Sequence, residues 1–232
     1  MYKVISFGHR CATGTFMQGL KVKTESYPFD WLISKLHVIK DCIETNFVHF
    51  LNVNNYVIQH TETYNMIDDK KYHLCNEIIQ VNTYYETNKD NTQTYNFKLA
   101  LNHRYIHEHY DYYQRCINRL YDLFKSDIKK YYIYFHPICG INDYQTNKNA
   151  IMAEFDDFNN YIINKTINTF GIYFILIKHT TDTKSIKIID TPTYCVFILY
   201  CNENFLDGAA PFMGDCDNEC QEVMTILQNI LI

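Results

Sequence analysis

A chain of 232 residues, 47% of them hydrophobic, can bury a substantial core, and its length fits one domain. The net charge is −5, the pI is near 6.0, and the chain has no long basic run. The chain therefore lacks the basic surface that most nucleic-acid-binding proteins have, and we expect no nucleic-acid partner. No apolar stretch approaches the roughly 18 residues of a membrane-spanning helix, and the N-terminus becomes polar too early for a secretory signal. We therefore expect no membrane partner and a location in the cytoplasm, or in the host cytoplasm if the gene is viral.

The hydrophobic pattern predicts a chain in which strands and helices alternate. In chain order we expect a strand at 3–7, a helix at 11–20, a loop around Pro28, a helix at 32–50, an irregular or hairpin-containing polar insertion at 51–101, a helix at 109–126, a strand at 131–135, a helix at 147–168, strands at 172–177, 185–189 and 194–200, and a helix at 216–231. Such alternation favours parallel pairing with right-handed crossovers. The prediction is a single α/β domain over 1–232, with three layers and a mostly parallel sheet flanked by helices.

The segment Ile5–Cys11, with the sequence ISFGHRC, is where we expect chemistry. Gly8 ends the first strand and Cys11 opens the helix that follows, at the sheet edge where ligands bind in parallel folds. A helix N-terminus and the neighbouring His9 and Arg10 favour a thiolate, and the first-turn N–H groups are oriented to hold an oxyanion. The alternative is an inert buried thiol, which is the commoner role of a free cysteine.

The segment Tyr27–Trp31, with the sequence YPFDW, contains the single tryptophan of the chain. A proline-fixed turn between large aromatic residues predicts a rigid plug in which Asp30 is desolvated unless it has a partner. Asp30 is expected to cap a helix that begins near Leu32, to orient a site histidine, or to do both.

The densest polar cluster, Asn102–Asp111, contains three histidines. His103 and His107 are four residues apart and could share a helix face as a metal pair, although a solvated helix start with tyrosines packed behind it is the better explanation of any single histidine. His136 follows the predicted strand at 131–135 and is a competing general base.

The nine cysteines are spread along a chain large enough to have its own core, so we expect reduced thiols. Cys216 and Cys220, with Cys201 upstream, lack a partner pair at zinc spacing. The sequence therefore predicts neither a metal site nor another cofactor.

The motif at 6–11 followed by Pro28–Trp31 resembles the opening of the putative papain-like cysteine peptidases, a family of bacteria and large DNA viruses. Further along, Asn102 and His103 ahead of 113–120 look like the histidine-containing segment of that family, before its basic helix. The usual His-Asp pair of the family reads His103-Arg104 in this chain.

This resemblance implies that Cys11 is a nucleophile and His103 its base, in a cysteine-dependent hydrolase or acyltransferase. We expect Asp30 to orient the histidine. The sequence does not identify the substrate, for which a protein or a peptide is the first candidate. Two alternatives stay open: a glycan- or nucleotide-sugar-related transferase that uses the same loop, and a non-catalytic interaction domain with a Tyr-rich surface. The residues expected to bind the substrate or the oxyanion are Gly8, His9, Arg10 and Trp31.

Overall fold

The computed structural model of the protein describes residues 1–8, 10–30, 32–67, 71–85, 99–101, 105–138, 141–178, 186–201 and 218–231. Within them the main sheet has the strand order β1-β6-β7-β9-β8. These strands are β1 (Tyr2–Ser6), β6 (Lys129–Ile138), β7 (Thr169–Lys178), β9 (Tyr194–Cys201) and β8 (Ile186–Asp190). The first four run parallel to one another. The predicted parallel sheet is thus confirmed for its main part.

The strand β8 is the exception, because it pairs antiparallel with β9. Only residues 191–193 connect the two strands, and the Thr191 N–H donates to the Tyr194 carbonyl across this turn, at 2.9 Å. A connection that short closes a hairpin, whereas a parallel pair needs a crossover of a dozen or more residues.

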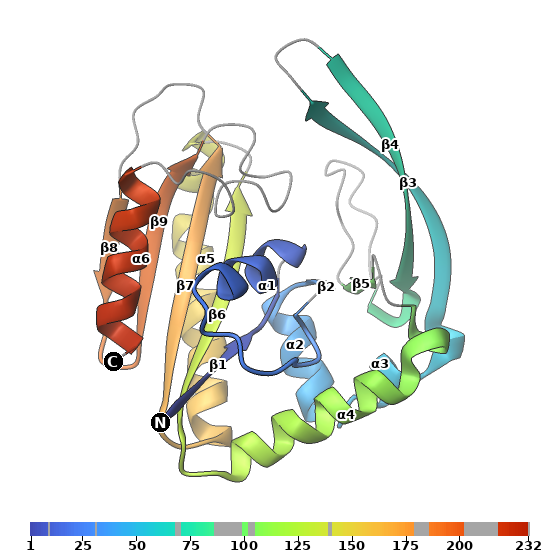
Figure 1. Ribbon diagram of the computed structural model, residues 1–232, viewed down its shortest axis with the longest axis horizontal. Coiled ribbons are helices and arrows are strands. Elements are labelled where there is room, and N and C mark those ends of the chain that lie inside the picture. Colours follow the sequence, from blue (N-terminus) through green and yellow to red (C-terminus); the bar gives the residue numbers. More distant parts are fainter. Residues whose placement is uncertain are drawn as a thin grey trace.

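Helices cover both faces of the main sheet (Figure 1). Each face has its own apolar cluster, and neighbouring residues of β6 alternate between them: Tyr131 and Ile133 join one cluster, and Tyr132 joins the other. A strand that is buried on both faces has a continuous run of apolar residues, which explains why the sequence predicted β6. One face is covered by α1 (Arg10–Gly19) and α6 (Asn218–Leu231), and the other by α2 (Leu36–Glu44), α4 (Ile106–Lys125) and α5 (Ile141–Lys165).

A second, antiparallel sheet has the strand order β2-β5-β4-β3. Its long hairpin extends away from the main sheet (Figure 1) and lies within the segment predicted to be irregular or to contain a hairpin. The strands are β2 (Leu32–Ser34), β5 (Leu99–Leu101), β4 (Lys71–Asn82) and β3 (Tyr56–Ile67), with short helical turns α3 (Val48–Leu51), η1 (Val53–Asn55) and η2 (Thr83–Tyr85) beside them.

The predicted helix at 32–50 is wrong at both ends. Its first three residues form β2, because they pair with β5, and α2 begins only at Leu36. Near the other end, Asn46 and Phe47 have left-handed φ values of 53° and 60°, which stop α2 before α3 begins. The break places the Phe47 ring in the core, where its centroid lies 5.6 Å from that of the Phe29 ring.

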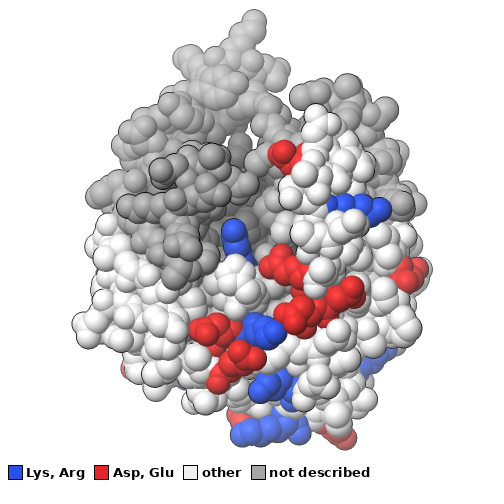
Figure 2. Space-filling view, turned by 180° about the vertical axis from the view of Figure 1, so that it is seen from behind, with Lys and Arg blue, Asp and Glu red and all other residues white. Residues whose placement is uncertain are grey.

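The face of the molecule opposite to the view in Figure 1 carries acidic and basic side chains next to one another, as Figure 2 shows. Among the described residues, Lys40 and Asp157 form an ion pair with 2.9 Å between the ammonium and the carboxylate. In the part of the chain that the structure describes, no helix combines the length and the hydrophobicity needed to cross a bilayer.

Candidate active site

The first strand ends in a tightly packed turn. Gly8 has a left-handed φ of 95°, and its carbonyl accepts a hydrogen bond from the Thr13 hydroxyl at 2.6 Å. The Ser34 hydroxyl of β2 donates to the Phe7 carbonyl at 3.3 Å, so β2 lies against the end of β1. The helix α1 starts at Arg10, which puts the backbone of Cys11 in its first turn, as the sequence predicts.

Gly8→Ala should disrupt this turn for two separable reasons. A Cβ at this position would overlap the Ser34 hydroxyl, and a left-handed φ costs a non-glycine residue roughly 1–2 kcal/mol. We expect a loss of at least about 2 kcal/mol in the free energy of unfolding, measured by urea denaturation. In the double variant Gly8→Ala/Ser34→Ala we expect recovery of only that part of the lost free energy of unfolding that comes from the overlap with the Ser34 hydroxyl. A Gly8→Ala variant as stable as the wild type would contradict this description of the turn.

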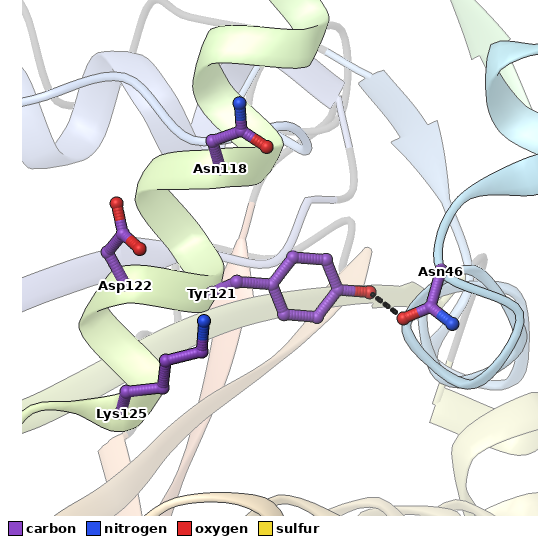
Figure 3. Close-up of a pocket in the computed structure, with 5 residues that line it drawn as sticks. All are labelled: Asn46, Asn118, Tyr121, Asp122 and Lys125. Carbon is purple, nitrogen blue, oxygen red and sulfur yellow. Dashed lines mark hydrogen bonds between the residues drawn. The ribbon is translucent and has the colours of Figure 1, made fainter.

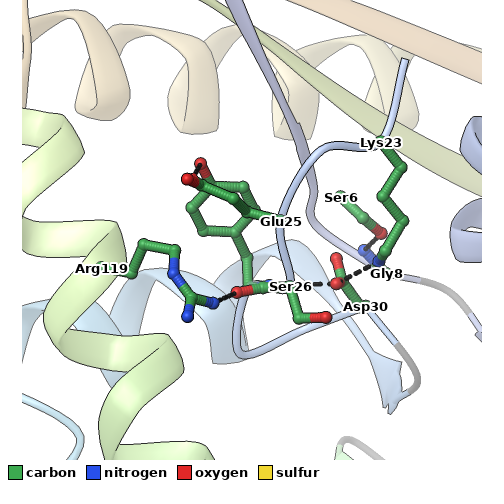
Figure 4. A network of polar contacts seen from close by, with 8 residues as sticks. Ser6, Gly8, Lys23, Glu25, Ser26, Asp30 and Arg119 are labelled. Atoms are coloured by element: carbon green, nitrogen blue, oxygen red, sulfur yellow. Dashed lines mark hydrogen bonds and ion pairs between the residues drawn. The ribbon is translucent and has the colours of Figure 1, made fainter. Parts of the chain in front are cut away.

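Asp30 is the buried centre of a polar network in the loop that follows α1 (Figure 4). Its Oδ2 atom accepts a hydrogen bond from the Tyr27 N–H at 3.0 Å and forms an ion pair with the Lys23 ammonium, whose side chain is only 7% exposed. Its Oδ1 atom is also buried, and among the described residues it has no hydrogen-bond partner. Burial raises the pKa of Asp30, while Lys23, the Tyr27 N–H and then Arg119 act in the opposite direction.

The expectation that Asp30 caps the next helix is wrong. The helix α2 begins at Leu36, with Lys35 at the N-cap position, because the intervening residues belong to β2. Asp30 instead closes its own turn: its N–H donates to the Tyr27 carbonyl at 3.4 Å while its carboxylate accepts from the Tyr27 N–H. Only the Oδ1 atom is left without a hydrogen-bond partner among the described residues.

The helix α4 holds this loop from the other side. Arg119 donates a hydrogen bond to the Ser26 carbonyl, and Figure 4 shows its guanidinium reaching across to the loop. Glu25 accepts a hydrogen bond from the Tyr27 hydroxyl at 3.1 Å and pairs with Lys3 of β1 at 3.2 Å. The Asp30 loop is thus tied both to the first strand and to α4.

The strand that follows this loop pairs with the strand that precedes the predicted base. In the β2–β5 ladder, Leu32 is opposite Leu101. Asp30 comes two residues before Leu32 in the sequence, and His103 comes two residues after Leu101. The described part of this ladder thus holds Leu32 opposite Leu101, and β2 itself lies close to Gly8, since a Cβ on Gly8 would meet Ser34 and the Leu32 carbonyl.

Several predicted site residues lie outside the described residues. They are His9, Trp31 and His103, together with the side chains of Arg10 and Cys11.

The competing base, His136, lies inside β6 and not after it, because the strand continues to Ile138. Its Nδ1 atom is buried and has no hydrogen-bond partner among the described residues. Burial lowers the pKa of His136, which leaves the ring neutral at physiological pH. Its ring packs against Phe155 and Tyr134, with centroids 5.9 Å and 6.3 Å away.

The segment that follows His103 is held by a residue that sequence reasoning missed. Gln80 of β4 is fully buried, and its side chain contacts both Ile106 and His107 at the start of α4. Lys23 and Arg119 were also missed, because nothing in the local sequence shows which loop each will contact. In the described ranges, no group of three or more His, Cys, Asp or Glu side chains is arranged to hold a metal ion.

A separate pocket of about 540 Å³ lies between α4 and the end of α2 (Figure 3). It is lined by polar residues, and the Tyr121 hydroxyl reaches across it to the Asn46 side chain at 3.3 Å. None of the predicted site residues lines this pocket, so it is distinct from the candidate active site. Its lining residues are Asn46, Asn118, Tyr121, Asp122 and Lys125.

Comparison with known proteins identifies a family. No curated protein and no solved structure shows significant similarity to the chain. The family model described as "Putative papain-like cysteine peptidase (DUF1796)" matches residues 2–180, which include β1, the Asp30 loop, both sheets as far as β7, and α4. The chain therefore belongs to the family of putative papain-like cysteine peptidases.

Proposed function

We propose that the protein is a cysteine-dependent hydrolase or acyltransferase in which Cys11 is the nucleophile, His103 the general base and Asp30 the acid that orients the histidine. Its substrate is an acyl compound, with a protein or peptide as the first candidate. Family membership supports the thiol chemistry, and the residue roles rest on the arrangement of the surrounding chain.

The observation that carries this proposal is the β2–β5 ladder. It pairs Leu32, which follows Asp30 closely, with Leu101, which closely precedes His103. The same β2 strand contacts the end of β1 through the hydrogen bond from Ser34 to Phe7. Phe7, Leu32 and Leu101, which are distant in sequence, therefore lie along one short strand, and this supports the proposal that the catalytic residues near them in the sequence act together.

The two oxygens of Asp30 support its proposed role. Oδ2 is held by Lys23 and the Tyr27 N–H, which fix the position of the carboxylate. Oδ1 is buried and has no described partner, and a buried carboxylate oxygen requires a donor. An imidazole N–H is such a donor, and an acid in this position fixes both the ring orientation and the tautomer, as in catalytic triads.

In the proposed reaction, His103 takes the proton of the Cys11 thiol, and the resulting thiolate attacks the carbonyl carbon of the substrate. The imidazolium then gives its proton to the leaving group as the carbonyl–heteroatom bond breaks, which leaves a thioester on Cys11. Water, or another acceptor in the case of acyl transfer, then gives a proton to His103 as it attacks the thioester carbon. The carbon–sulfur bond breaks, the acyl group leaves on the acceptor, and the Cys11 sulfur is released as the thiolate paired with the protonated His103. Backbone N–H groups in the first turn of α1 stabilise the oxyanion of each tetrahedral intermediate.

Alkylation by iodoacetamide, mapped by mass spectrometry, tests the reactivity of Cys11. Near pH 6.5 we expect Cys11 to react at least about 10-fold faster than any other cysteine, because a thiolate is the reacting species. Cys42, Cys116 and Cys195 are internal controls, since all three are buried and burial raises the pKa of each thiol. Equal labelling of all accessible thiols, with Cys11 no faster than the others, would refute the nucleophile assignment.

A further inference from the structure

Gln80 occupies an unusual position for a fully buried polar residue. It lies in β4, and its Cα is paired with that of Leu101, the last residue of β5. Its side chain points to the start of α4, where Oε1 accepts the Ile106 N–H at 2.7 Å. One residue therefore contacts the chain on both sides of the segment that contains His103.

The contact at the start of α4 replaces a missing cap. Tyr105, at the N-cap position, makes no side-chain capping hydrogen bond, so the first N–H groups of the helix need another acceptor. Gln80 of β4 provides it for the Ile106 N–H. Its Nε2 atom also lies 2.9 Å from Nε2 of His107, and because an amide nitrogen only donates, the His107 nitrogen is the acceptor.

The first turn of α4 is set apart from the rest of the helix. His109 has non-helical backbone angles (φ −125°, ψ 25°), so the first turn, Ile106–Glu108, is separated from the long remainder of the helix by a kink. Side-chain contacts of this turn therefore matter more for its position than those of an uninterrupted helix would. Gln80 supplies two of them, at Ile106 and His107.

We infer that Gln80 is a positioning residue for the general base. Its backbone pairs with that of Leu101, and its side chain holds Ile106, so it fixes the chain on both sides of the short segment whose sequence contains His103. This inference rests on the proposed function, because it assumes that His103 is the base. Gln80 itself is not expected to contact substrate.

Substitutions separate positioning from a merely structural role. Gln80→Met fills the same volume but removes both side-chain hydrogen bonds, whereas Gln80→Glu keeps an acceptor for the Ile106 N–H, and His107 can donate to it in its other tautomer. Asn82→Leu is the matched control. Asn82 is also buried in β4, but its amide donates to the His49 carbonyl at 3.0 Å and not to α4.

The experiment is the pH dependence of iodoacetamide alkylation at Cys11, with urea unfolding of each variant in parallel. For Gln80→Met we expect the apparent pKa of Cys11 to rise toward the ordinary value of about 8.5, with alkylation about 3- to 10-fold slower at pH 6.5. Gln80→Glu should retain the wild-type profile, and so should Asn82→Leu despite its lower stability. Gln80→Asn, whose shorter amide cannot reach α4, carries the same expectation as Gln80→Met and replaces it if that variant does not fold.

Each outcome decides something. A wild-type profile in folded Gln80→Met or Gln80→Asn overturns the inference alone, and so does an equal shift in Asn82→Leu, which would indicate general loosening of the fold. An ordinary apparent pKa for Cys11 in the wild type overturns the proposed function, and the inference with it.

Discussion

Lys23→Met is expected to lower the free energy of unfolding by about 3–5 kcal/mol at neutral pH, because it leaves the carboxylate of Asp30 buried without its counterion. Asp30 is fully buried and the Lys23 side chain is 7% exposed, so water cannot compensate for the loss. Urea denaturation at pH 7 measures the change. Lys40→Met is the matched control, since Lys40 pairs with the largely exposed Asp157 and should lose about 1 kcal/mol or less.

The cost of Lys23→Met should depend on pH. Burial already raises the pKa of Asp30 against the opposing effect of Lys23, and removing Lys23 raises it further. Because a protonated carboxyl needs no counterion, the difference between wild type and variant should shrink as the pH falls toward 4 and be largest near neutral pH. The double variant Lys23→Met/Asp30→Asn should recover about 2 kcal/mol at pH 7 relative to Lys23→Met.

Two results would contradict this account of the buried pair. One is a cost for Lys23→Met that is the same at pH 4 and pH 7, which would show that the loss comes from packing alone. The other is a double variant no more stable than Lys23→Met, which would show that the charge of Asp30 is not what Lys23 offsets.

His103→Ala is expected to slow the alkylation of Cys11 about 10-fold at pH 6.5 and to leave it almost unchanged at pH 10. Without an imidazolium beside it, the thiol returns toward its ordinary pKa of about 8.5, so the thiolate is scarce at low pH and abundant at high pH. The higher nucleophilicity of a more basic thiolate offsets part of the loss. The measurement is the alkylation rate at Cys11 across this pH range.

The control for this prediction is His136→Ala. The ring of His136 packs against Phe155, and burial lowers its pKa, so we expect this variant to lose stability but to keep the wild-type pH profile of Cys11. The opposite pattern, with His136→Ala shifting the profile and His103→Ala leaving it unchanged, would transfer the role of base to His136.

The main sheet was predictable because its strands are buried on both faces. Three short apolar runs between helical patterns marked these strands, at 131–135, 172–177 and 194–200. Each of the three lies within an observed parallel strand. The strand β2 was not predictable, because its three residues continue the apolar spacing of the helix that follows them. Their partner in β5 lies more than sixty residues away in the sequence, and only that pairing makes them a strand.

The candidate site shows the same division between local and long-range signals. A glycine-ended strand before Cys11 is a local pattern, and the structure bears it out with a left-handed Gly8 and a helix that starts at Arg10. The ion pair of Asp30 with Lys23 requires a particular loop path, and the hydrogen bond from Ile106 to Gln80 joins two distant elements. Neither contact leaves a recognisable spacing in the sequence.

The most direct test of the proposed site is the titration of His103 by NMR, in the wild type and in Cys11→Ala. If a thiolate and an imidazolium form a pair, the negative charge of Cys11 raises the pKa of His103, and its removal should lower that pKa by at least about one unit. Resonances of His103 are assigned by their loss in His103→Ala. A His103 titration that is the same in both proteins would contradict the pairing of these two residues.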